Sequence, residues 1–434
     1  MIGFIKQIFE RGTLLTPNIS DPESIELGQS NESQNTISAF MQIMSGRDTT
    51  QNAVLTTQQQ FYIEYIRNEV NKYPMQLLKD IFSSTLRSPS GDIGSNEIFV
   101  FLKSIAESAQ VGRGFNIDSA LRHMVKESIL CNDALELPLR NQALAIIFSC
   151  VGWICMLYPP LLSTPPQFEF INIDKSQCLC VSDSQPISTA NRLLCEVIQD
   201  FGPLLPVRRE SIVPNASDSV FSAESLYVSL LNASTLTQLG GIEVEWVTHI
   251  SSHLEFDPET PKLFVFAYPS FCKVSENQSS PFGQIVRSYY DEYNMPTGFS
   301  SSAFLKEVRQ SYRLLFSEDS RSCRHYKNHE RKRLLQKGLL DPYLEELCGT
   351  HNTSRHQSSY SKATDFPIFA ARLSIIQEYI QRQNPETISM LWKDRRNLLQ
   401  WYTFWAVSII GTLGILLSVI QTGLNAVQVH EISS

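Results

Sequence analysis

The sequence lacks the short motifs by which the common enzyme classes are recognised. It contains no Gly-x-Ser-x-Gly elbow, P-loop, dinucleotide-binding glycine motif or protein-kinase motif. No internal repeat is evident either. These absences leave other catalytic arrangements open, but they remove the usual grounds for predicting an enzyme.

Positive charge and paired cysteines are also scarce. A net charge of −8 argues against nucleic acid as a main partner, because phosphate binding needs a basic surface. The nine cysteines are an odd number, and Cys150/Cys155 and Cys178/Cys180 have no second pair at zinc-site spacing. We therefore expect buried free thiols, and neither a metal nor another cofactor.

The N-terminus has no secretory signal. Its apolar residues are interrupted by Lys6, and no small-residue cleavage site follows. Residues 1–48 are expected to form a short amphipathic segment, able to touch a membrane surface or pack on the domain, and then a flexible lead-in that is rich in polar residues.

What the sequence has is a long apolar stretch near its end. Residues 401–420 run from Trp401 to Ile420 without a charge, and a helix that crosses a bilayer needs about 20 such residues. Trp401, Tyr402 and Trp405 lie at its upstream edge, where aromatic rings sit at headgroup depth, and Gly411 and Gly414 are common inside spanning helices. We predict a transmembrane helix and flank at residues 398–422, not a buried core helix.

Basic residues flank this helix on one side only. Lys393, Arg395 and Arg396 precede it, and no Lys or Arg follows. Since Lys and Arg stay cytoplasmic, the body should face the cytosol, with residues 423–434 as a short tail on the far side. This order predicts insertion after synthesis, as in tail-anchored proteins, with the endoplasmic reticulum as the favoured organelle.

The rest of the chain is predicted to be mainly helical. Hydrophobic residues make up 42% of the 434 residues, enough for a real core. Helical spacing occurs in residues 49–86, 95–109, 117–129, 188–201, 223–236, 283–293, 302–316 and 366–382. Asp118 is a candidate cap near the start of the third. Residues 143–157 are apolar but short for a span, so we expect a buried core helix, with a re-entrant or spanning segment as the alternative.

Two segments alternate as strands do, at residues 242–247 and 262–267. The predicted fold is therefore mainly α with a small β hairpin or sheet (α+β): a helical globular domain plus one C-terminal transmembrane helix. A proline-rich loop at residues 158–166 marks a boundary between a helical subdomain, residues 49–158, and a second helical subdomain with the β element, residues 167–384.

The strongest candidate for chemistry is His249, His253 and Asp257. Their spacing of four would place them on one helix face, where they could hold a metal or act in catalysis. However, Ser251 and Ser252 replace the Glu of a His-Glu-x-x-His motif. The alternative is a coincidence in which His253 and Asp257 cap a turn by hydrogen bonds.

Residues 321–337 carry nine basic residues, counting His325 and His329. As a helix they would offer a positive face to anionic lipid headgroups. The alternative is a solvated helix whose charges pair with acidic neighbours.

Six Asn-x-Ser/Thr sequons would accept glycans only if the body were lumenal. They lie at Asn18, Asn31, Asn215, Asn232, Asn277 and Asn352.

Several stretches together resemble an uncharacterised family of filamentous-fungal membrane proteins. They are LLNASTLTQLGGIEVEWVTHISSHLEFD, KLFVFAYPSFC, EVRQSYRLLFSEDSR and LWKDRRNLLQWYTFWAV, together with GWICMLYPP. The resemblance implies a fungal source and a C-terminal anchor, and it suggests an accessory role beside secondary-metabolite enzymes. Because the family has no assigned activity, the resemblance supplies no catalytic residues.

We expect a single-pass membrane protein that acts as a non-catalytic scaffold or accessory factor, with the lipid bilayer and other proteins as its partners. The alternatives are a membrane-bound enzyme using the His249, His253 and Asp257 site, and a lumenal glycosylated membrane protein.

Overall fold

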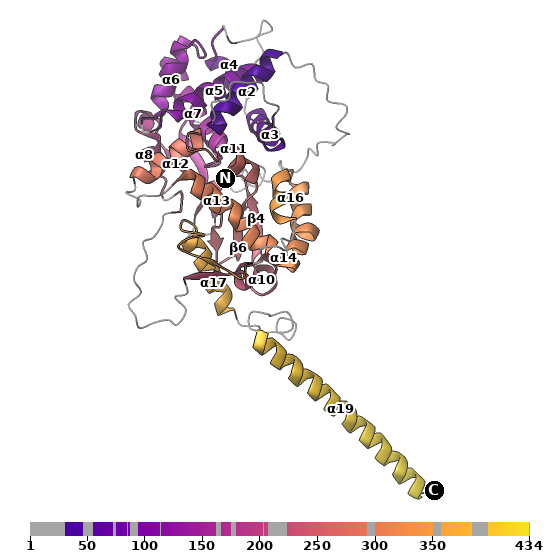
Figure 1. Ribbon diagram of the computed structural model, residues 1–434. Coiled ribbons are helices and arrows are strands. Elements are labelled where there is room, and N and C mark those ends of the chain that lie inside the picture. Colours follow the sequence, from indigo (N-terminus) through magenta and orange to yellow (C-terminus); the bar gives the residue numbers. More distant parts are fainter. Residues whose placement is uncertain are drawn as a thin grey trace, which may run out of the picture.

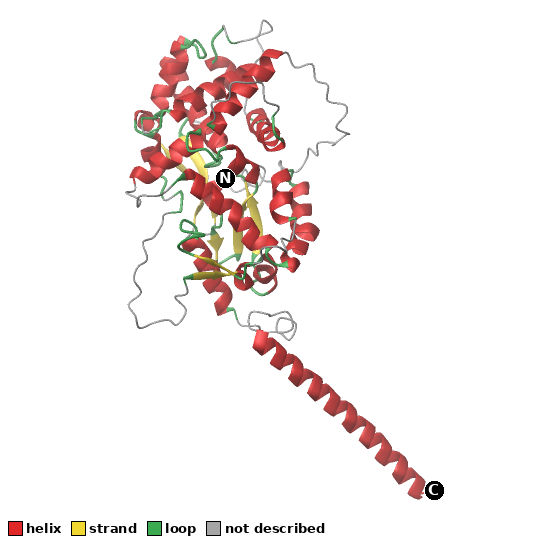
Figure 2. Cartoon of the chain, viewed as in Figure 1, coloured by secondary structure: helices red, strands yellow, loops and turns green. Residues whose placement is uncertain are grey.

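The computed structural model shows a mainly helical body with small sheets and one long helix that projects from it (Figures 1 and 2). The structure describes residues 31–46, 55–72, 75–84, 86, 94–112, 114–161, 166–174, 179–202, 204–206, 224–292, 300–349, 357–383 and 398–433. The predicted α+β class is therefore confirmed.

The first described element corrects the predicted lead-in. The expected amphipathic segment at the extreme N-terminus lies outside the described residues. Helix α2 spans Asn31–Ser45 and buries Phe40, Met41 and Met44, so this part of the segment predicted to be flexible is a core helix. Its apolar residues recur at intervals of three and four, as on one face of a helix. The segment looks flexible by composition because the residues between them are polar.

Helix α7, Leu139–Cys155, runs through the middle of the N-terminal helices (Figure 1). Every residue from Ala143 to Cys155 is buried, as a helix apolar on all sides requires. The predicted core helix is confirmed. The elements packed around it include α3 Thr57–Asn71, α4 Met75–Ile81, α5 Ser95–Gln110, α6 Ile117–Lys126 and the 3₁₀ turn η2 Asn132–Leu135.

Asp118 does not cap α6 as predicted. The cap is Asn116, whose side chain accepts a hydrogen bond from the Ser119 N–H. Asp118 is buried inside the first turn and pairs with Arg122 and Arg140 at 2.8 and 2.7 Å. Burial alone would raise the pKa of Asp118, but the hydrogen bonds from Arg140 and Arg122 outweigh it and lower that pKa.

An antiparallel hairpin that the sequence analysis missed follows α7. It consists of β1, Phe168–Asp174, and β2, Leu179–Gln185. Phe168 and Phe170 are fully buried, and their rings contact Phe148 of α7 and Phe201. The hairpin therefore closes one side of the helical core.

The predicted strands form a sheet but not a hairpin. Strand β4, Glu243–Val247, lies parallel to β6, Lys262–Phe266, and the short strand β5, Phe256–Asp257, lies antiparallel on the other side of β6. The connection from β4 to β6 contains the 3₁₀ turn η4, Ile250–Ser252, and then β5. Because of this longer connection, β6 can run in the same direction as β4.

The helix predicted at residues 223–236 begins instead as a strand. Strand β3, Ser225–Tyr227, pairs antiparallel with β7, Ser359–Ser361, and two short helices follow it, α9 Val228–Leu231 and α10 Ala233–Gln238. The partner strand lies more than 130 residues further along, so local spacing carries no sign of it.

The remaining described elements of the body are helices and helical turns. They are η3 Ile187–Asn191, α8 Leu194–Gln199, α11 Pro269–Val274, α12 Pro281–Glu292, α13 Ser301–Tyr312, the π-helical turn η5 Arg313–Ser317, α14 Ser320–His325, the π-helical turn η6 Tyr326–Glu330, α15 Arg331–Gln336, α16 Pro342–Cys348 and α17 Ala370–Arg382.

One hydrophobic cluster contains buried residues from Ile37 to Ile380. It joins the two predicted subdomains through aromatic contacts. Tyr62 of α3 lies 5.8 Å from the ring of Phe271 in α11, and its hydroxyl donates to the Ile154 carbonyl at 2.6 Å. The segments before and after the proline-rich loop therefore share one interior.

Candidate functional site

Helix α19 is the one helix among the described residues that is long and apolar enough to cross a membrane. It spans Leu398–Ser433, and its apolar part, Tyr402–Asn425, has 24 residues with a mean hydropathy of 2.1. At 1.5 Å per residue this part is about 36 Å long, against about 30 Å of hydrocarbon. The helix continues through most of the segment predicted to be a tail.

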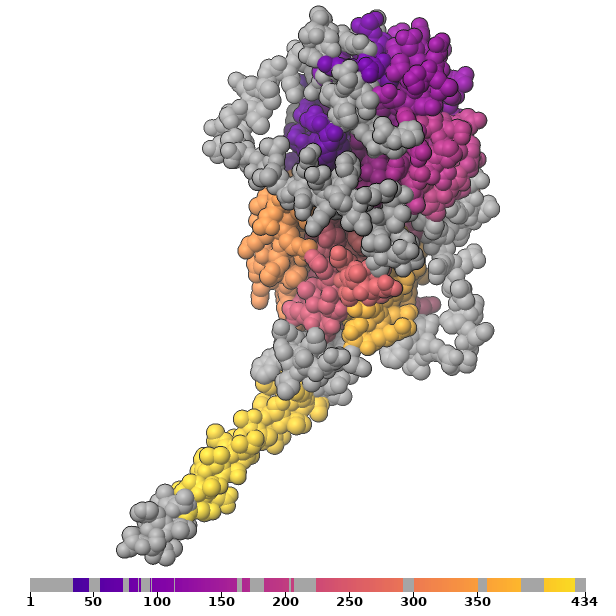
Figure 3. All heavy atoms as spheres, turned by 180° about the vertical axis from the view of Figure 1, so that it is seen from behind, coloured from indigo at the N-terminus to yellow at the C-terminus, as the bar shows by residue number. Residues whose placement is uncertain are grey.

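None of this apolar part is buried in the protein. Figure 3 shows the helix in yellow, extending away from the body. Eleven of the 17 large hydrophobic side chains exposed among the described residues lie on α19, including Ile410 and Ile415, each 70% exposed. Soluble monomers rarely expose a contiguous apolar surface of this kind, so this surface is typical of a helix that contacts lipid or another protein.

Two hydroxyl groups of α19 are satisfied within the helix. The Thr412 hydroxyl donates to the Ser408 carbonyl at 2.7 Å, and the Thr422 hydroxyl donates to the Ser418 carbonyl at 2.8 Å. This arrangement suits hydrocarbon, where an unpaired polar group costs several kcal/mol. Gly411 and Gly414 have no atom within 4 Å of where a Cβ would be, so neighbouring parts of the protein do not occupy their faces.

The predicted interfacial residues are described in part. Tyr402 is 63% exposed at the start of the apolar part, and the Trp405 ring lies 6.3 Å from Phe404. Ile420 is 51% exposed and lies within the apolar part. Trp401 belongs to α19, but its side chain is outside the described set, as are Lys393, Arg395 and Arg396 altogether.

The structure does not bring His249, His253 and Asp257 together on a helix. His249 and His253 flank the three-residue turn η4, where a spacing of four does not converge. Asp257 accepts hydrogen bonds from the N–H groups of Glu259 and Thr260, so it caps the turn that follows β5. Within the described ranges no three His, Cys, Asp or Glu side chains are placed to share a metal ion.

His253 has a single tautomer that suits its neighbours. The Phe266 N–H can only donate, and it lies 3.2 Å from Nδ1, so Nδ1 accepts. The proton is therefore on Nε2, which donates to the Ser311 Oγ at 2.7 Å, and Ser311 donates to the Val308 carbonyl. Nε2 has no lone pair for the Ser311 proton, so the pair is not a serine nucleophile and its base.

Burial keeps both histidines neutral. It lowers the pKa of His253 to about 3, with a further contribution from the positive charge of Arg372, and lowers the pKa of His249 to about 4. The His249 Nε2 lies 2.9 Å from the Ser252 Oγ. Both imidazoles are therefore neutral near pH 7, and His253 is a structural group of the core.

Arg372 on α17 is the polar group that the sequence analysis missed here. Its guanidinium donates to the carbonyls of Ser251 and His253 at 2.8 and 2.5 Å, and to Glu255 Oε1 at 2.9 Å. Its side chain is 11% exposed, and burial lowers its pKa although Glu255 opposes this. Arg372 thereby fixes the loop that carries the histidines against α17.

No protein-family model matches this chain, and no curated protein or solved structure matches it either. The resemblance to fungal membrane proteins stays a prediction, and the functional argument depends on the molecule itself.

Two buried carboxylates outside the predicted site also have structural roles. Glu307 accepts from the N–H groups of Ile368 and Phe369, both at 3.0 Å, and so caps the start of α17. Asp341 is fully buried, accepts from the N–H and Oγ of Ser270, and has its pKa raised to about 6 by burial.

The basic segment is helical, and part of it is paired as the second alternative predicted. Arg331 contacts Glu345 of α16 at 2.6 Å, while Arg333 contacts Glu243 of β4 at 2.7 Å. Lys337 pairs with Glu245 of β4 at 2.7 Å. These three side chains hold the helix against its neighbours.

The described sequons differ in access. Asn232 is 6% exposed, and its Nδ2 donates to the Val228 and Ser229 carbonyls, so the folded body has no room for a glycan there. Asn277 is exposed, although its Nδ2 donates to the Gly46 carbonyl at 2.7 Å. Asn31 begins α2. Asn18, Asn215 and Asn352 lie outside the described residues.

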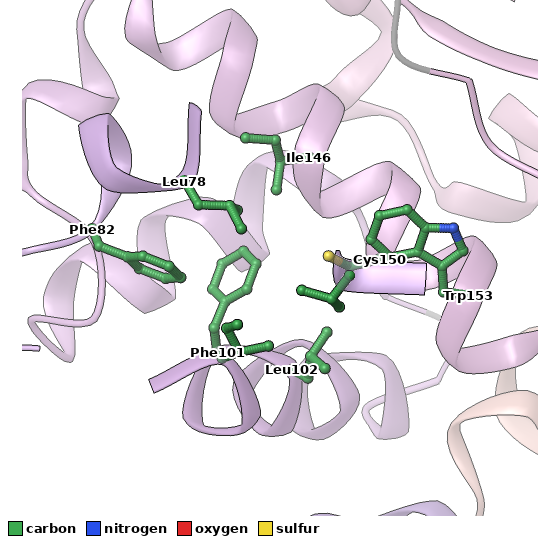
Figure 4. A pocket seen from close by; sticks show the side chains of 9 residues that line it. Leu78, Phe82, Phe101, Leu102, Ile146, Cys150 and Trp153 are labelled. Atoms are coloured by element: carbon green, nitrogen blue, oxygen red, sulfur yellow. The ribbon is translucent and has the colours of Figure 1, made fainter. Parts of the chain in front are cut away.

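A small pocket between α3, α4, α5 and α7 has an apolar lining (Figure 4). Phe82, Phe101 and Leu78 face Ile146 and the Cys150 thiol across it. Burial raises the pKa of this thiol well above its usual range, so it is a poor nucleophile. Seven described cysteines are free thiols and six of them are buried, as predicted.

Proposed function

We propose that α19 anchors this protein in a membrane as a single-pass span, and that the body is a non-catalytic scaffold or accessory factor that holds other proteins there. The observation that carries the proposal is that no residue of Tyr402–Asn425, an apolar part about as long as a bilayer core is thick, is buried in the body. Each Leu, Ile, Phe or Val near the centre of such a helix favours insertion by about 0.3–0.6 kcal/mol.

The contrast with α7 supports this use of α19. Both helices are apolar, but Ala143–Cys155 of α7 is buried in the body, whereas no residue of Tyr402–Asn425 in α19 is. A helix that the protein interior does not cover needs another apolar environment, and a bilayer supplies it.

For the body, a scaffold fits better than an enzyme. The one constellation that suggested chemistry is committed to packing: His253 is neutral and locked by Phe266 and Ser311, and Asp257 caps a turn. No observation favours the membrane-bound enzyme over this reading.

The body is proposed to face the cytosol, on the strength of Lys393, Arg395 and Arg396 ahead of the anchor. The endoplasmic reticulum is the favoured membrane. An accessory role beside fungal secondary-metabolite enzymes rests on the sequence resemblance alone.

Deletion of residues 398–434 tests the anchor. The truncated protein should leave carbonate-washed membranes and stay in the supernatant, while a matched deletion of residues 426–434, which keeps Tyr402–Asn425 intact, should remain in the pellet. If the larger deletion still pellets with washed membranes, the single-anchor proposal fails.

A further inference from the structure

The outward side of the helix formed by α14, η6 and α15 carries basic residues without acidic partners. Between Ser320 and Lys337 the one acidic residue is Glu330, which is only 4% exposed. Arg324, Lys327 and Lys332 are exposed. In the part of the chain that the structure describes, no carboxylate lies within ion-pair distance of these three.

The π-helical turn brings these charges to one side. Lys332 follows Arg324 by eight residues, which in a regular α-helix would leave it about 80° away around the axis. The turn Tyr326–Glu330 takes up one extra residue. Eight residues here therefore cover the rotation of about seven, almost two full turns, and Lys332 returns to the side of Arg324.

An exposed aliphatic side chain lies beside these charges. Leu335 is 53% exposed. It follows Lys327 by eight residues, and with the extra residue of the π-helical turn these also make almost two full turns, so Leu335 lies on the side of Lys327. Arg324, Lys327, Lys332 and Leu335 together form what we name the basic face. Cations around an aliphatic group are the combination by which helices lie on anionic membrane surfaces.

The basic face lies in the part of the body from which the chain leaves toward the anchor. Helix α14 contacts α10, α10 contacts α9, and α9 contacts α17, the last described element before α19. Figure 1 shows α10, α14 and α17 at the same end of the body. An anchor that holds this end at a membrane also holds the basic face near the headgroups.

We propose that the basic face docks on anionic lipid headgroups of the membrane in which α19 is inserted. This inference rests on the proposed anchoring. The chain as a whole carries a net charge of −8, so an anionic surface repels most orientations of the body. Contact through the basic face replaces this repulsion by attraction and selects one orientation.

The test uses the full chain in phosphatidylcholine vesicles with and without phosphatidylserine. Flotation first reports whether the protein is anchored. A membrane-impermeant amine reagent then labels the lysines, and mass spectrometry reports Lys327 and Lys332 relative to Lys126, an exposed lysine on α6. Molecules whose body faces the vesicle interior are labelled at no lysine, so the ratio to Lys126 does not depend on how many there are.

Labelling of Lys327 and Lys332 should fall about fivefold or more in the anionic vesicles and should recover at high salt. Arg324→Gln with Leu335→Ser should restore labelling, because it weakens docking without removing a reporter lysine. The matched control, Arg287→Gln with Val111→Ser, removes an exposed charge and an exposed aliphatic group elsewhere and should change nothing.

The outcomes separate the two proposals. If the protein floats with both vesicle types but the lysine ratios do not depend on lipid charge, docking of the basic face is overturned and the anchor stands. Equally low labelling of Lys327 and Lys332 in both lipids, insensitive to salt, points to contact with a second copy of this chain and also overturns it. If the protein does not float at all, the anchor itself fails.

Discussion

The indole Nε1 of Trp246 donates a hydrogen bond of 2.8 Å to Glu330 Oε2. The bond joins strand β4 to the π-helical turn η6 across a buried contact. Burial alone would raise the pKa of Glu330, but the contact with His325, the hydrogen bond from Trp246 and the charge of Arg333 outweigh it and lower that pKa. Trp246 therefore helps to keep the buried Glu330 carboxylate ionised.

Trp246→Phe should destabilise the protein by about 1–3 kcal/mol, because it leaves the buried Glu330 carboxylate with one donor fewer. Denaturant unfolding of the full chain in detergent, followed by circular dichroism, measures this. Tyr379→Phe is the control, since its hydroxyl reaches the Gly240 carbonyl only at 3.4 Å. A Trp246→Phe variant as stable as the control would show that the bond contributes little.

His253→Ala should destabilise the protein by about 2–5 kcal/mol, because the Phe266 N–H and the Ser311 hydroxyl both lose a partner in the core. Metal content of the purified protein should be the same with and without this substitution. Metal analysis by mass spectrometry checks the second part. Loss of a bound metal in the variant would revive the enzyme alternative.

His253 also makes stability depend on pH. Its pKa is about 3 in the folded protein and about 6.5 when unfolded, so the unfolded chain binds the proton first. Stability from this residue is full above pH 6.5 and falls by about 1.4 kcal/mol per unit as the pH drops toward 3. His253→Gln should reduce that slope between pH 6 and 4, in unfolding experiments like those above; an unchanged slope would contradict it.

Asp341 should act in the opposite direction over an overlapping range. Its pKa is about 6 when folded and 3.8 when unfolded, so the folded protein binds the proton more tightly. Its contribution is greatest below pH 3.8 and decreases by about 3 kcal/mol as the pH rises to 6, then stays level. The free energy of unfolding of the wild type, minus that of Asp341→Asn, should fall by about this amount from pH 4 to above 6. A constant difference would mean that burial does not shift this carboxyl.

The wild-type protein should show no change in mobility after endoglycosidase treatment, because the body is proposed to face the cytosol. Asn277 is the most informative reporter among the described sequons, since it is exposed and Asn232 is not. A mobility shift that Asn277→Gln abolishes would place the body in the lumen and reverse the proposed orientation.

Helices whose environment is uniform could be predicted from the sequence, and contacts between distant segments could not. Residues 143–157 and 401–420 are both apolar all round, so each had to be covered by protein or by lipid. Residues 143–157 are too short to cross a bilayer, and this length correctly predicted the core helix α7. The parallel pairing of β4 and β6 was not predictable, because alternation shows which side of a strand is buried but not the direction of its partner.

The candidate site shows the same limit. A spacing of four between His249 and His253 has meaning only on a helix, and here a three-residue turn separates them. The residue that organises their loop, Arg372, lies 119 positions beyond His253. Nothing near Arg372 in the sequence distinguishes it from the many arginines of solvent-facing helices.

The shared interior from Ile37 to Ile380 has a mechanical consequence. Described helices that share one core turn together, so a torque applied at α17 reorients α2 and α6 with it. A membrane that fixes the orientation of the basic face would then also fix the direction in which α2 and α6 point.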